Sequence, residues 1–318
     1  MRLTVCVSAL SVLLAVPLTE NILGQSKSDD AVAKTTDLLW TKLDTHVSEM
    51  VDKFDGVMGV AIVDLTDGRS ILKNADRVFP TASSIKIAIL LELYHQEQRA
   101  REGMQGKARL NDVYDVDPKV LVDFSSIMQG LTPGLTKVTN HDLAQFMIAV
   151  SDNTASNVLI DRVGIENVNA MLRSLGLMKT MLRRHMMDFE AAKRGSENVS
   201  TPREMTQLLE AIYKGKALNK ELTAEFIKQL STLKESEIQH DLPEGIRVAN
   251  KPGSLKGVRT DSGIVFAKDR PFAISVMTQN VANEHRASAR ICWIALEAFH
   301  YFDMRGKTSE YGRVLEAK

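Results

Sequence analysis

Apolar residues follow one another or alternate over short runs near both ends of the chain, and this pattern predicts β-strands. The first two runs, residues 58–65 and 70–72, flank Thr66-Asp67-Gly68-Arg69, a sequence typical of a tight turn. The sequence therefore predicts a β-hairpin near the N-terminus. Three further strands are expected toward the other end of the chain, at residues 247–251, 261–267 and 271–278.

Between and beside these strands, apolar residues recur every three or four positions, which predicts amphipathic helices. Thr139 with Asp142 and Thr201 with Glu204 have the spacing of capping boxes, in which two side chains cap the first turn of a helix. Pro202 suits the first position of a helix. The apolar positions that define the expected helices fall within residues 35–54, 87–94, 143–150, 168–175, 205–212, 222–230 and 288–302.

Strands at both ends of the chain with helices between them predict two lobes. An α/β lobe would combine residues 35–80 with 243–302, and a helical lobe, 81–242, would be inserted between them. Residues 25–34 and 303–318 are polar and are expected to form a flexible leader and a tail. Nothing in the pattern marks an interface between copies, so a monomer is expected.

The first 24 residues have the pattern of an export signal. Arg2 supplies positive charge, Leu3–Leu18 is almost wholly apolar, and polar residues follow. An uncleaved membrane anchor is the alternative, but a membrane span needs about 20 apolar residues. The sequence predicts a signal peptide at 1–24, no stable membrane insertion after its removal, and a protein of the periplasm or the extracellular space.

Removal of that segment leaves Cys292 as the only cysteine, so the exported chain can form no internal disulfide. Cys292 lies in an apolar helical run, which predicts a buried structural thiol.

The charge balance argues against nucleic acid as a partner, because 40 Lys and Arg residues face 40 Asp and Glu residues. The seven histidines are scattered without metal-ligand spacing, and no glycine-rich phosphate-binding motif is present. Neither a metal nor an organic cofactor is expected.

A catalytic arrangement is suggested by the stretch FPTASSIKIAIL, residues 79–90. Ser83 and Lys86 stand three residues apart where a loop meets a helix, so both side chains lie on one side of its first turn. A neutral amine beside a hydroxyl can take its proton, and the free N–H groups of a helix start can hold an oxyanion. By itself this spacing also fits an ordinary solvated helix start.

Two further motifs follow in order: Ser151-Asp152-Asn153 after the helix that begins near Thr139, and Lys251-Pro252-Gly253-Ser254 among the C-terminal strands. Each alone is typical of a turn. Together with Ser-x-x-Lys they resemble the three motifs of penicillin-recognising serine enzymes. The chain resembles class A serine β-lactamases over nearly its whole mature length, including the hairpin VMGVAIVDLTDGRSI, the segment ENVNAMLRSLGL and the terminal helix.

The resemblance implies a catalytic group of three residues. Ser83 would attack an amide carbonyl and form an acyl-enzyme, and Lys86, with its amine near neutrality, would help to deprotonate it. The hydroxyl of Ser151 would pass a proton to the leaving nitrogen. Asp152 would fix the turn rather than touch the substrate.

The resemblance also implies a substrate-binding set: Asn153, Lys251, Gly253 and Ser254. Asn153 would hold the acylamide group of the substrate, Lys251 would attract its carboxylate, and the N–H groups of Ser83 and Ser254 would hold the oxyanion. The implied fold is α/β (α+β), a two-lobed serine β-lactamase/transpeptidase-like architecture. It has a five-stranded antiparallel sheet with flanking helices and an all-helical lobe, with the site in the groove between them.

The first departure from the family is Pro252, where a threonine or serine is usual. Proline offers no hydroxyl to a substrate carboxylate and no N–H to a neighbouring strand, which restricts it to an edge strand. Ser254 or Arg259 are candidates for the missing contact.

The second departure concerns the loop 183–200, RRHMMDFEAAKRGSENVS, where the family carries a glutamate that activates the deacylating water. Counting from the two ends of the loop places that position at Met187 or at His185, and neither is a carboxylate. Asp188, Glu190 and His185 are the candidate replacements, and surface loop residues are the alternative interpretation of all three.

The function expected from the resemblance is an exported serine hydrolase that opens the β-lactam ring of antibiotics. A D,D-peptidase or esterase that acts on a peptidoglycan-like peptide remains open, because the loop and Pro252 are altered. A penicillin-binding receptor that is acylated and deacylates slowly also remains open.

Overall fold

The structure, a computed structural model, describes residues 25–309 and 311–315, so the expected signal peptide at 1–24 lies outside the described residues. A five-stranded antiparallel sheet runs in the order β2-β1-β9-β8-β7, which confirms the expected sheet. Its strands are β1 (Val57–Asp64), β2 (Ser70–Lys73), β7 (Val248–Leu255), β8 (Val258–Val265) and β9 (Phe272–Gln279). Segments from the two ends of the chain meet at its centre, where Val57 pairs with Gln279 and Asp64 with Phe272.

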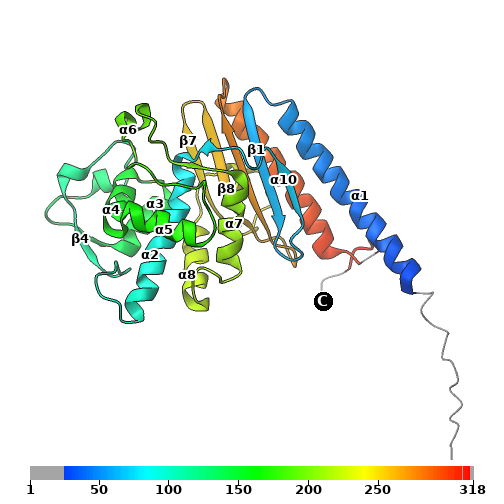
Figure 1. Ribbon diagram of the computed structural model, residues 1–318, viewed down its shortest axis with the longest axis horizontal. Coiled ribbons are helices and arrows are strands. Elements are labelled where there is room, and N and C mark those ends of the chain that lie inside the picture. Colours follow the sequence, from blue (N-terminus) through cyan, green and yellow to red (C-terminus); the bar gives the residue numbers. More distant parts are fainter. Residues whose placement is uncertain (1–24, 310, 316–318) are drawn as a thin grey trace, which may run out of the picture.

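Two long helices, α1 (Gln25–Asp52) and α10 (Glu284–Lys307), cover one face of the sheet (Figure 1). Alternate residues of the strands point toward these two helices and form a buried core with them, which includes Val60, Ile62 and Ile274. The ring of Trp40 on α1 packs edge-on against Tyr301 of α10, with centroids 5.4 Å apart. Apolar burial and aromatic contact therefore fix the N-terminal helix to the C-terminal one.

Both expected irregular ends are partly helical. α1 begins at Gln25, so the backbone of residues 25–34 is helix and not a flexible leader. This segment has no proline or glycine to interrupt a helix. Adding residues to a helix that is already formed also avoids the unfavourable step of starting a new one. α10 continues to Lys307, within the expected tail, and Lys307 pairs with Asp303 one turn earlier at 2.7 Å.

The helical lobe surrounds α2 (Lys86–Arg101), in which every residue from Lys86 to Tyr94 is buried. α7 packs on the second face of the sheet, and the core there joins helical residues such as Leu208 to strand residues such as Ile264. The other helices are α3 (Asn140–Ala149), α4 (Asn153–Val163), α5 (Ile165–Ser174), α6 (Phe189–Lys193), α7 (Pro202–Tyr213), α8 (Lys220–Leu230) and α9 (Glu237–His240). Two short strand pairs, β3 (Phe79–Pro80) with β6 (Val199–Ser200) and β4 (Val113–Asp115) with β5 (Lys137–Thr139), were not expected.

One of the two expected capping boxes forms. Thr139 and Asp142 cap each other at the start of α3. At α7, Thr201 accepts the backbone N–H of Glu204, but the Glu204 carboxylate does not return to the cap. It accepts the N–H groups of residues 178–180 and the Thr180 hydroxyl instead. Thr180 is buried, so its donors need a partner within the protein.

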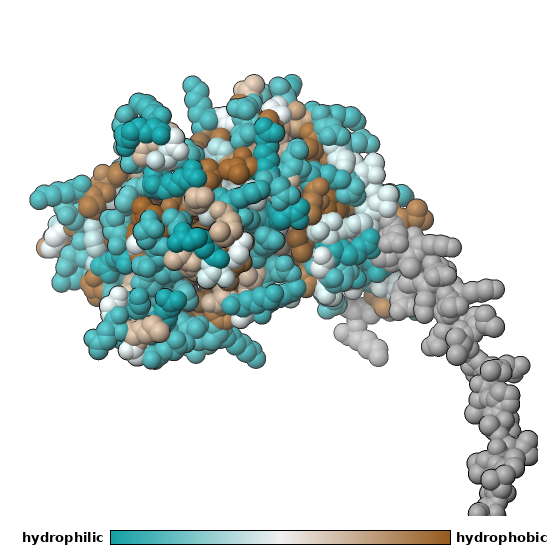
Figure 2. All heavy atoms as spheres, viewed as in Figure 1, coloured by the Kyte–Doolittle hydropathy of each residue, from teal (hydrophilic) through white to brown (hydrophobic). Residues whose placement is uncertain are grey.

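The surface seen in Figure 2 is mostly hydrophilic, and its apolar residues form small separate groups. Among the residues that the structure describes, no helix is both long enough and apolar enough to span a membrane.

Candidate active site

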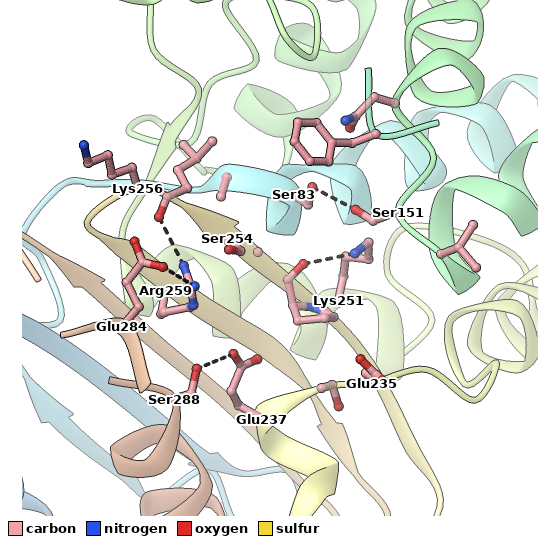
Figure 3. Close-up of a pocket in the computed structure, with 18 of the residues that line it drawn as sticks. Ser83, Ser151, Glu235, Glu237, Lys251, Ser254, Lys256, Arg259, Glu284 and Ser288 are labelled. Carbon is pink, nitrogen blue, oxygen red and sulfur yellow. Dashed lines mark hydrogen bonds and ion pairs between the residues drawn. The ribbon is translucent and has the colours of Figure 1, made fainter. Parts of the chain in front are cut away.

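A cavity of about 1090 Å³ separates the helical lobe from the open edge of the sheet. Six of the seven predicted site residues line it (Figure 3), namely Ser83, Ser151, Asn153, Lys251, Gly253 and Ser254. The seventh, Lys86, lies fully buried beneath them. Residues distant in the sequence are thus brought together as the three motifs predict.

Ser83 stands on a short 3₁₀ helix, η1 (Ala82–Ile85), that leads directly into α2. Its neighbours anchor this turn on both sides. Thr81 donates its N–H and its hydroxyl to the carbonyl of Asn198, at 2.9 and 3.1 Å. The buried Ser84 hydroxyl donates to the carbonyl of Lys251 at 3.0 Å, which ties η1 to β7. Ser83 is left partly exposed at the cavity floor.

A chain of hydrogen bonds joins Lys86 to Ser83 through Ser151. The Lys86 side-chain nitrogen Nζ lies 3.0 Å from Ser151 Oγ, and Ser151 Oγ donates to Ser83 Oγ at 2.9 Å. Nζ also donates to the Ser151 carbonyl at 2.7 Å and to Asn153 Oδ1 at 2.9 Å. Three acceptors therefore hold the amine, and Ser151 is the link between it and the nucleophile.

Ser151 reaches this position from a strained backbone. Its φ is +58°, in the left-handed region that non-glycine residues seldom adopt. The next residue, Asp152, is fully buried, caps α4 by accepting the Ala155 N–H at 2.9 Å, and accepts two further N–H groups from residues 127 and 128. These bonds support the prediction that Asp152 fixes the turn.

The pKa of Lys86 is lowered well below its usual value, chiefly by burial and further by the positive charge of Lys251. Asp152 opposes this shift with its negative charge. A neutral amine is thereby favoured at the end of the Ser83–Ser151 chain, and a neutral amine can accept a proton.

The pKa of Lys251 on β7 is also lowered from its usual value. Burial lowers its pKa to about 7, and the Lys234 charge adds to this while Asp261 opposes it. Asp261 is buried as well, and burial raises its pKa to about 7 although Asn250 and the Ile238 N–H bind its carboxylate. The charge that Lys251 presents to the cavity therefore changes near neutral pH.

Gly253 allows β7 to approach η1. A Cβ at this position would lie 2.7 Å from the Thr81 carbonyl oxygen, 2.8 Å from the Ser83 nitrogen and 2.6 Å from Thr260 Oγ1. No side chain fits in that space, so the glycine sets the distance between the serine and the strand that lines the cavity.

Pro252 lies on β7, the last strand of the sheet, as expected of a proline. Its carbonyl accepts the Lys251 ammonium at 3.0 Å. Arg259 lines the cavity, but its guanidinium binds Glu284 and the carbonyls of Leu255 and Val258 (Figure 3). A substrate carboxylate would have to share this arginine with Glu284.

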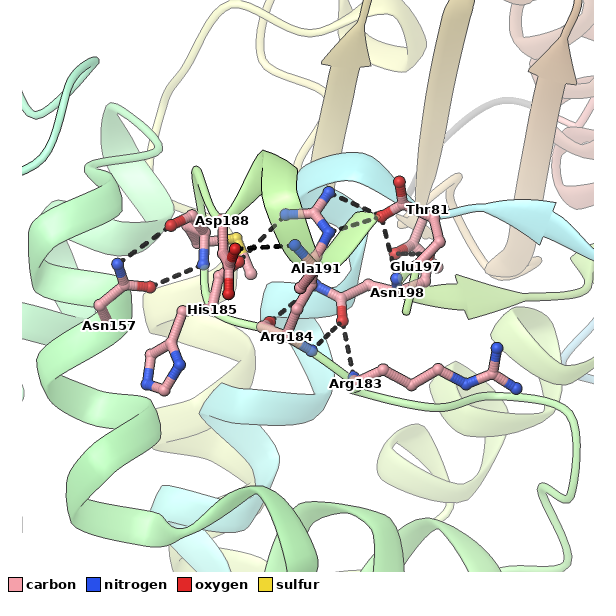
Figure 4. A network of polar contacts seen from close by, with 10 residues as sticks. Thr81, Asn157, Arg183, Arg184, His185, Asp188, Ala191, Glu197 and Asn198 are labelled. Carbon is pink, nitrogen blue, oxygen red and sulfur yellow. Dashed lines mark hydrogen bonds and ion pairs between the residues drawn. The ribbon is translucent and has the colours of Figure 1, made fainter. Parts of the chain in front are cut away.

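The three candidates for a deacylating base do not line the cavity. His185 pairs with Asp161 at 2.7 Å on the exposed surface. Asp188 caps α6 by accepting the Ala191 N–H at 2.9 Å (Figure 4). Glu190 pairs with Lys193 at 2.7 Å. The structure therefore gives them surface and capping contacts, in agreement with the alternative interpretation.

The loop presents Met186 and Met187 to the cavity instead. Asn157 of α4 fixes the backbone of Met186 from both sides: its Oδ1 accepts the Met186 N–H at 2.7 Å, and its Nδ2 donates to the Met186 carbonyl at 3.1 Å (Figure 4). Met186 lies between the two positions obtained by counting, His185 and Met187. Sequence reasoning missed Asn157, although it stands four residues after Asn153 on the same helix face.

A second clamp closes the loop. The Arg184 guanidinium, nearly buried, pairs with Glu197 at 2.6 Å, and Asn198 Oδ1 accepts the N–H groups of Arg183 and Arg184. Both ends of the loop are thus bonded to each other, and the serine turn is bonded to Asn198.

One group of side chains in the described part of the chain has the makings of a metal site. His240, Asp241 and Cys292 each offer a ligand atom, and these atoms all lie within 4.8 Å of one another. All three residues line the same cavity as Ser83. The spacing of histidines in the sequence gave no sign of this group, because its members come from segments 50 residues apart.

The fold is the β-lactamase/transpeptidase architecture, and the three motifs converge in its cavity. Comparison with known proteins agrees: residues 42–302 match the model of the "Beta-lactamase enzyme family". The chain belongs to this family.

Individual relatives are distant. Beta-lactamase SME-1 of Serratia marcescens is 24% identical over 251 residues, which cover 76% of this chain and 83% of that protein. The solved β-lactamase of Sphaerobacter thermophilus DSM 20745 is 29% identical with a TM-score of 0.73, covering 82% of this chain and 97% of its own. A mutant of PBP-A, solved as an acyl-enzyme complex with penicillin G, shares the fold with a TM-score of 0.73 at 24% identity over 83% of this chain and 97% of its own.

Proposed function

We propose that this protein is an exported serine hydrolase whose Ser83 is acylated by β-lactams and which releases the acyl group slowly. The hydrogen-bond chain from Lys86 through Ser151 to Ser83 carries this proposal, because it connects a nucleophile to a base of lowered pKa inside a cavity. The PBP-A complex supports it, since an acyl-enzyme of penicillin G fits a protein of this fold. Export rests on the pattern of the first 24 residues.

The proposed acylation moves one proton and breaks one bond. Ser83 Oγ attacks the lactam carbonyl, and its proton passes to Ser151 while Ser151 gives its own to the Lys86 amine. As the carbon–nitrogen bond breaks, the proton returns through Ser151 to the ring nitrogen. The backbone N–H groups of Ser83 and Ser254 would hold the oxyanion, a contribution of about 3–4 kcal/mol for one such donor in comparable sites.

The substrate is held by the cavity walls. The charge of Lys251 would attract the carboxylate of a β-lactam, and the Asn153 amide, which lines the cavity beside Ser151, would bind its acylamide group.

Release of the acyl group is the weak step. The cavity wall contributed by the loop 183–200 consists of Arg184, Met186, Met187, Phe189 and Asn198, none of them a carboxylate. A missing general base costs about 10²–10⁴-fold in rate. Acylation is expected to outrun hydrolysis, so that the acyl-enzyme accumulates.

A D,D-peptidase or esterase of the same fold is the second candidate. Two differences from the β-lactamase pattern favour it. Pro252 replaces the usual threonine or serine hydroxyl that binds the substrate carboxylate, and methionines stand where the loop usually carries the glutamate that activates water. Release of D-alanine from a D-alanyl-D-alanine peptide, without turnover of β-lactams, would decide for it. A penicillin-binding receptor would show a lasting adduct and no peptide cleavage.

The first experiment mixes the mature protein with a chromogenic cephalosporin and follows absorbance and protein mass together. A burst of about one equivalent, with a stable mass increase located on Ser83, is expected. Continued turnover with little adduct would contradict slow release and indicate a β-lactamase with another base. If the mixture showed no colour change and no adduct, the β-lactam function would be contradicted altogether.

Ser83→Ala is expected to abolish both the burst and the adduct. Ser70→Ala, an equal change at an exposed position of β2, serves as the control and should leave both unchanged. Retained labelling in Ser83→Ala would show that another residue is the nucleophile.

A further inference from the structure

The far wall of the cavity, where α9 meets α10, gathers three side chains that are good metal ligands. His240 is the last residue of α9, Asp241 follows it, and Cys292 lies on α10. An imidazole nitrogen, a carboxylate oxygen and a thiol sulfur lie within 4.8 Å of one another. None of the three takes part in the proposed reaction at Ser83.

We propose that His240, Asp241 and Cys292 bind a zinc ion in the wall of this cavity. Zinc takes thiolate, imidazole and carboxylate ligands at about 2.0–2.3 Å, so neighbouring ligand atoms in its tetrahedral shell lie roughly 3.5 Å apart. The observed limit of 4.8 Å is about 1 Å too wide. His240 and Asp241 pair with each other at 2.7 Å, and their side chains are 73% and 35% exposed. Zinc would replace this pair, and both side chains can rotate to close the gap while the helices stay in place.

Neighbouring contacts hold the ligands in position. Glu237, one turn before His240 and Asp241, accepts the hydroxyl of Ser288 at 3.0 Å, and Ser288 lies one turn before Cys292 on α10 (Figure 3). This bond fixes α9 against α10 and leaves Glu237 outside the ligand set. The elements that carry the ligands are therefore held together by this bond.

The charges around the sulfur favour a cation and disfavour a reactive thiol. Burial, together with the negative charges of Asp241, Glu237 and Asp261, raises the pKa of Cys292 to about 12. In the absence of metal the thiol stays protonated and is a poor nucleophile. Zinc would have to displace that proton to solvent, and the nearby carboxylates would attract the cation.

The three ligands leave one position of the zinc ion open. Because all of them line the cavity, that position faces the space that a substrate would enter. Three protein ligands with an open fourth position bind water or an anion. The proposed ion would thus give an otherwise acidic wall, formed by Glu235, Glu237 and Glu284 as well, a place for an anionic group of a ligand.

The test uses the mature chain without a histidine tag, stripped of metal and titrated with cobalt(II) and then zinc. One equivalent of cobalt is expected to bind and to produce the near-ultraviolet band of a cobalt–thiolate bond, and zinc should displace it. Cobalt bound without this band would overturn the proposal, because Cys292 is the only thiol of the mature chain.

Variants separate the ligands from the fold. His240→Ala and Asp241→Asn, at exposed positions, are expected to weaken zinc binding at least tenfold, and Cys292→Ser should abolish the thiolate band. His141→Ala, an exposed histidine at the start of α3 in the helical lobe, should bind zinc as the wild type does. Unchanged zinc affinity in folded His240→Ala, as judged by circular dichroism, would contradict the site.

Discussion

Single residues decide how far the proposed reaction proceeds, and Met186 is the most informative of them. Its backbone is held by Asn157 and it lines the cavity, whereas His185, Asp188 and Glu190 do not. A thioether cannot accept a proton from water, so the loop is in place without the base. The loop backbone therefore lies beside the cavity, but it carries no side chain that could act as the base there.

Met186→Glu is therefore expected to shorten the life of the acyl-enzyme. A carboxylate held on this fixed backbone can activate water, and a general base contributes about 10²–10⁴-fold. The measurement is the half-life of the mass adduct after excess antibiotic is removed. Met186→Gln, equal in size but without a base, is the control and should leave the half-life as in the wild type; an equal gain in both variants would contradict a role as base.

The charge of Lys251 gives the second prediction at this scale. Its pKa of about 7 means that the ammonium is present below pH 7 and lost above it, so acylation by a carboxylate-bearing penicillin should fall as the pH rises through about 7. The methyl ester of the same penicillin, which has no carboxylate, should not show this fall.

Lys234 lowers the pKa of Lys251, so Lys234→Met should move the fall to higher pH. The measurement is the second-order rate of adduct formation from pH 5.5 to about 9. Lys228→Met, at an exposed position of α8, is the control. A profile that does not move in Lys234→Met would show that another group sets this limb.

Among the elements, the contact between η1 and β7 holds the nucleophile against the strand edge. The Ser84 hydroxyl donates to the Lys251 carbonyl of β7 at 3.0 Å and shares a hydrogen bond of 2.7 Å with Thr260 of the neighbouring strand β8. Thr260 in turn donates to the Thr81 carbonyl at 3.0 Å. Gly253 permits this distance, since a Cβ would press on the Thr81 carbonyl and on Thr260. The serine turn and the strand therefore behave as one unit.

Gly253→Ala should separate η1 from β7 and disturb the oxyanion site. Overpacking of this kind costs about 1–3 kcal/mol of stability. We expect a lower melting temperature and a loss of acylation rate larger than that of binding. Gly130→Ala, where a Cβ meets open space, should change neither. A stable, fully active Gly253→Ala would show that this approach is not required.

At the scale of the whole molecule, the two lobes share one core. Strand residues Ala249, Ile264 and Ala273 belong to the same buried cluster as the interior of the helical lobe. The sheet also buries a separate core under α1 and α10. The sheet and the helical lobe inserted between its strands therefore form a single folding unit rather than two independent domains.

The fragment 81–242 is accordingly expected not to fold by itself, because removal of the sheet exposes the apolar faces of α7 and α2. Far-ultraviolet circular dichroism and the dispersion of amide resonances provide the measurement, with the full mature chain as control. A cooperative melting transition in the isolated fragment would contradict a shared core.

The sequence by itself determined the strands, most helices and the three motifs of the site. The spacing of apolar residues along the chain shows which side of an element is buried. This information is local, as are the turn residues of the hairpin at 58–72 and the capping spacing at Thr139, and both elements form as predicted. The candidate site residues Ser83, Ser151 and Lys251 could be predicted because they stand in short motifs of fixed order, and in the structure they line one cavity.

Only the tertiary structure decided the features that depend on contacts between distant segments. Met186 rather than His185 or Met187 holds the position clamped by Asn157, because counting along a loop of altered length cannot fix its path. Burial in the assembled core lowers the pKa of Lys86, and the packing of α9 on α10 brings His240 to Cys292. Local pattern specified the elements, whereas desolvation and long-range contact specified the chemistry of the cavity.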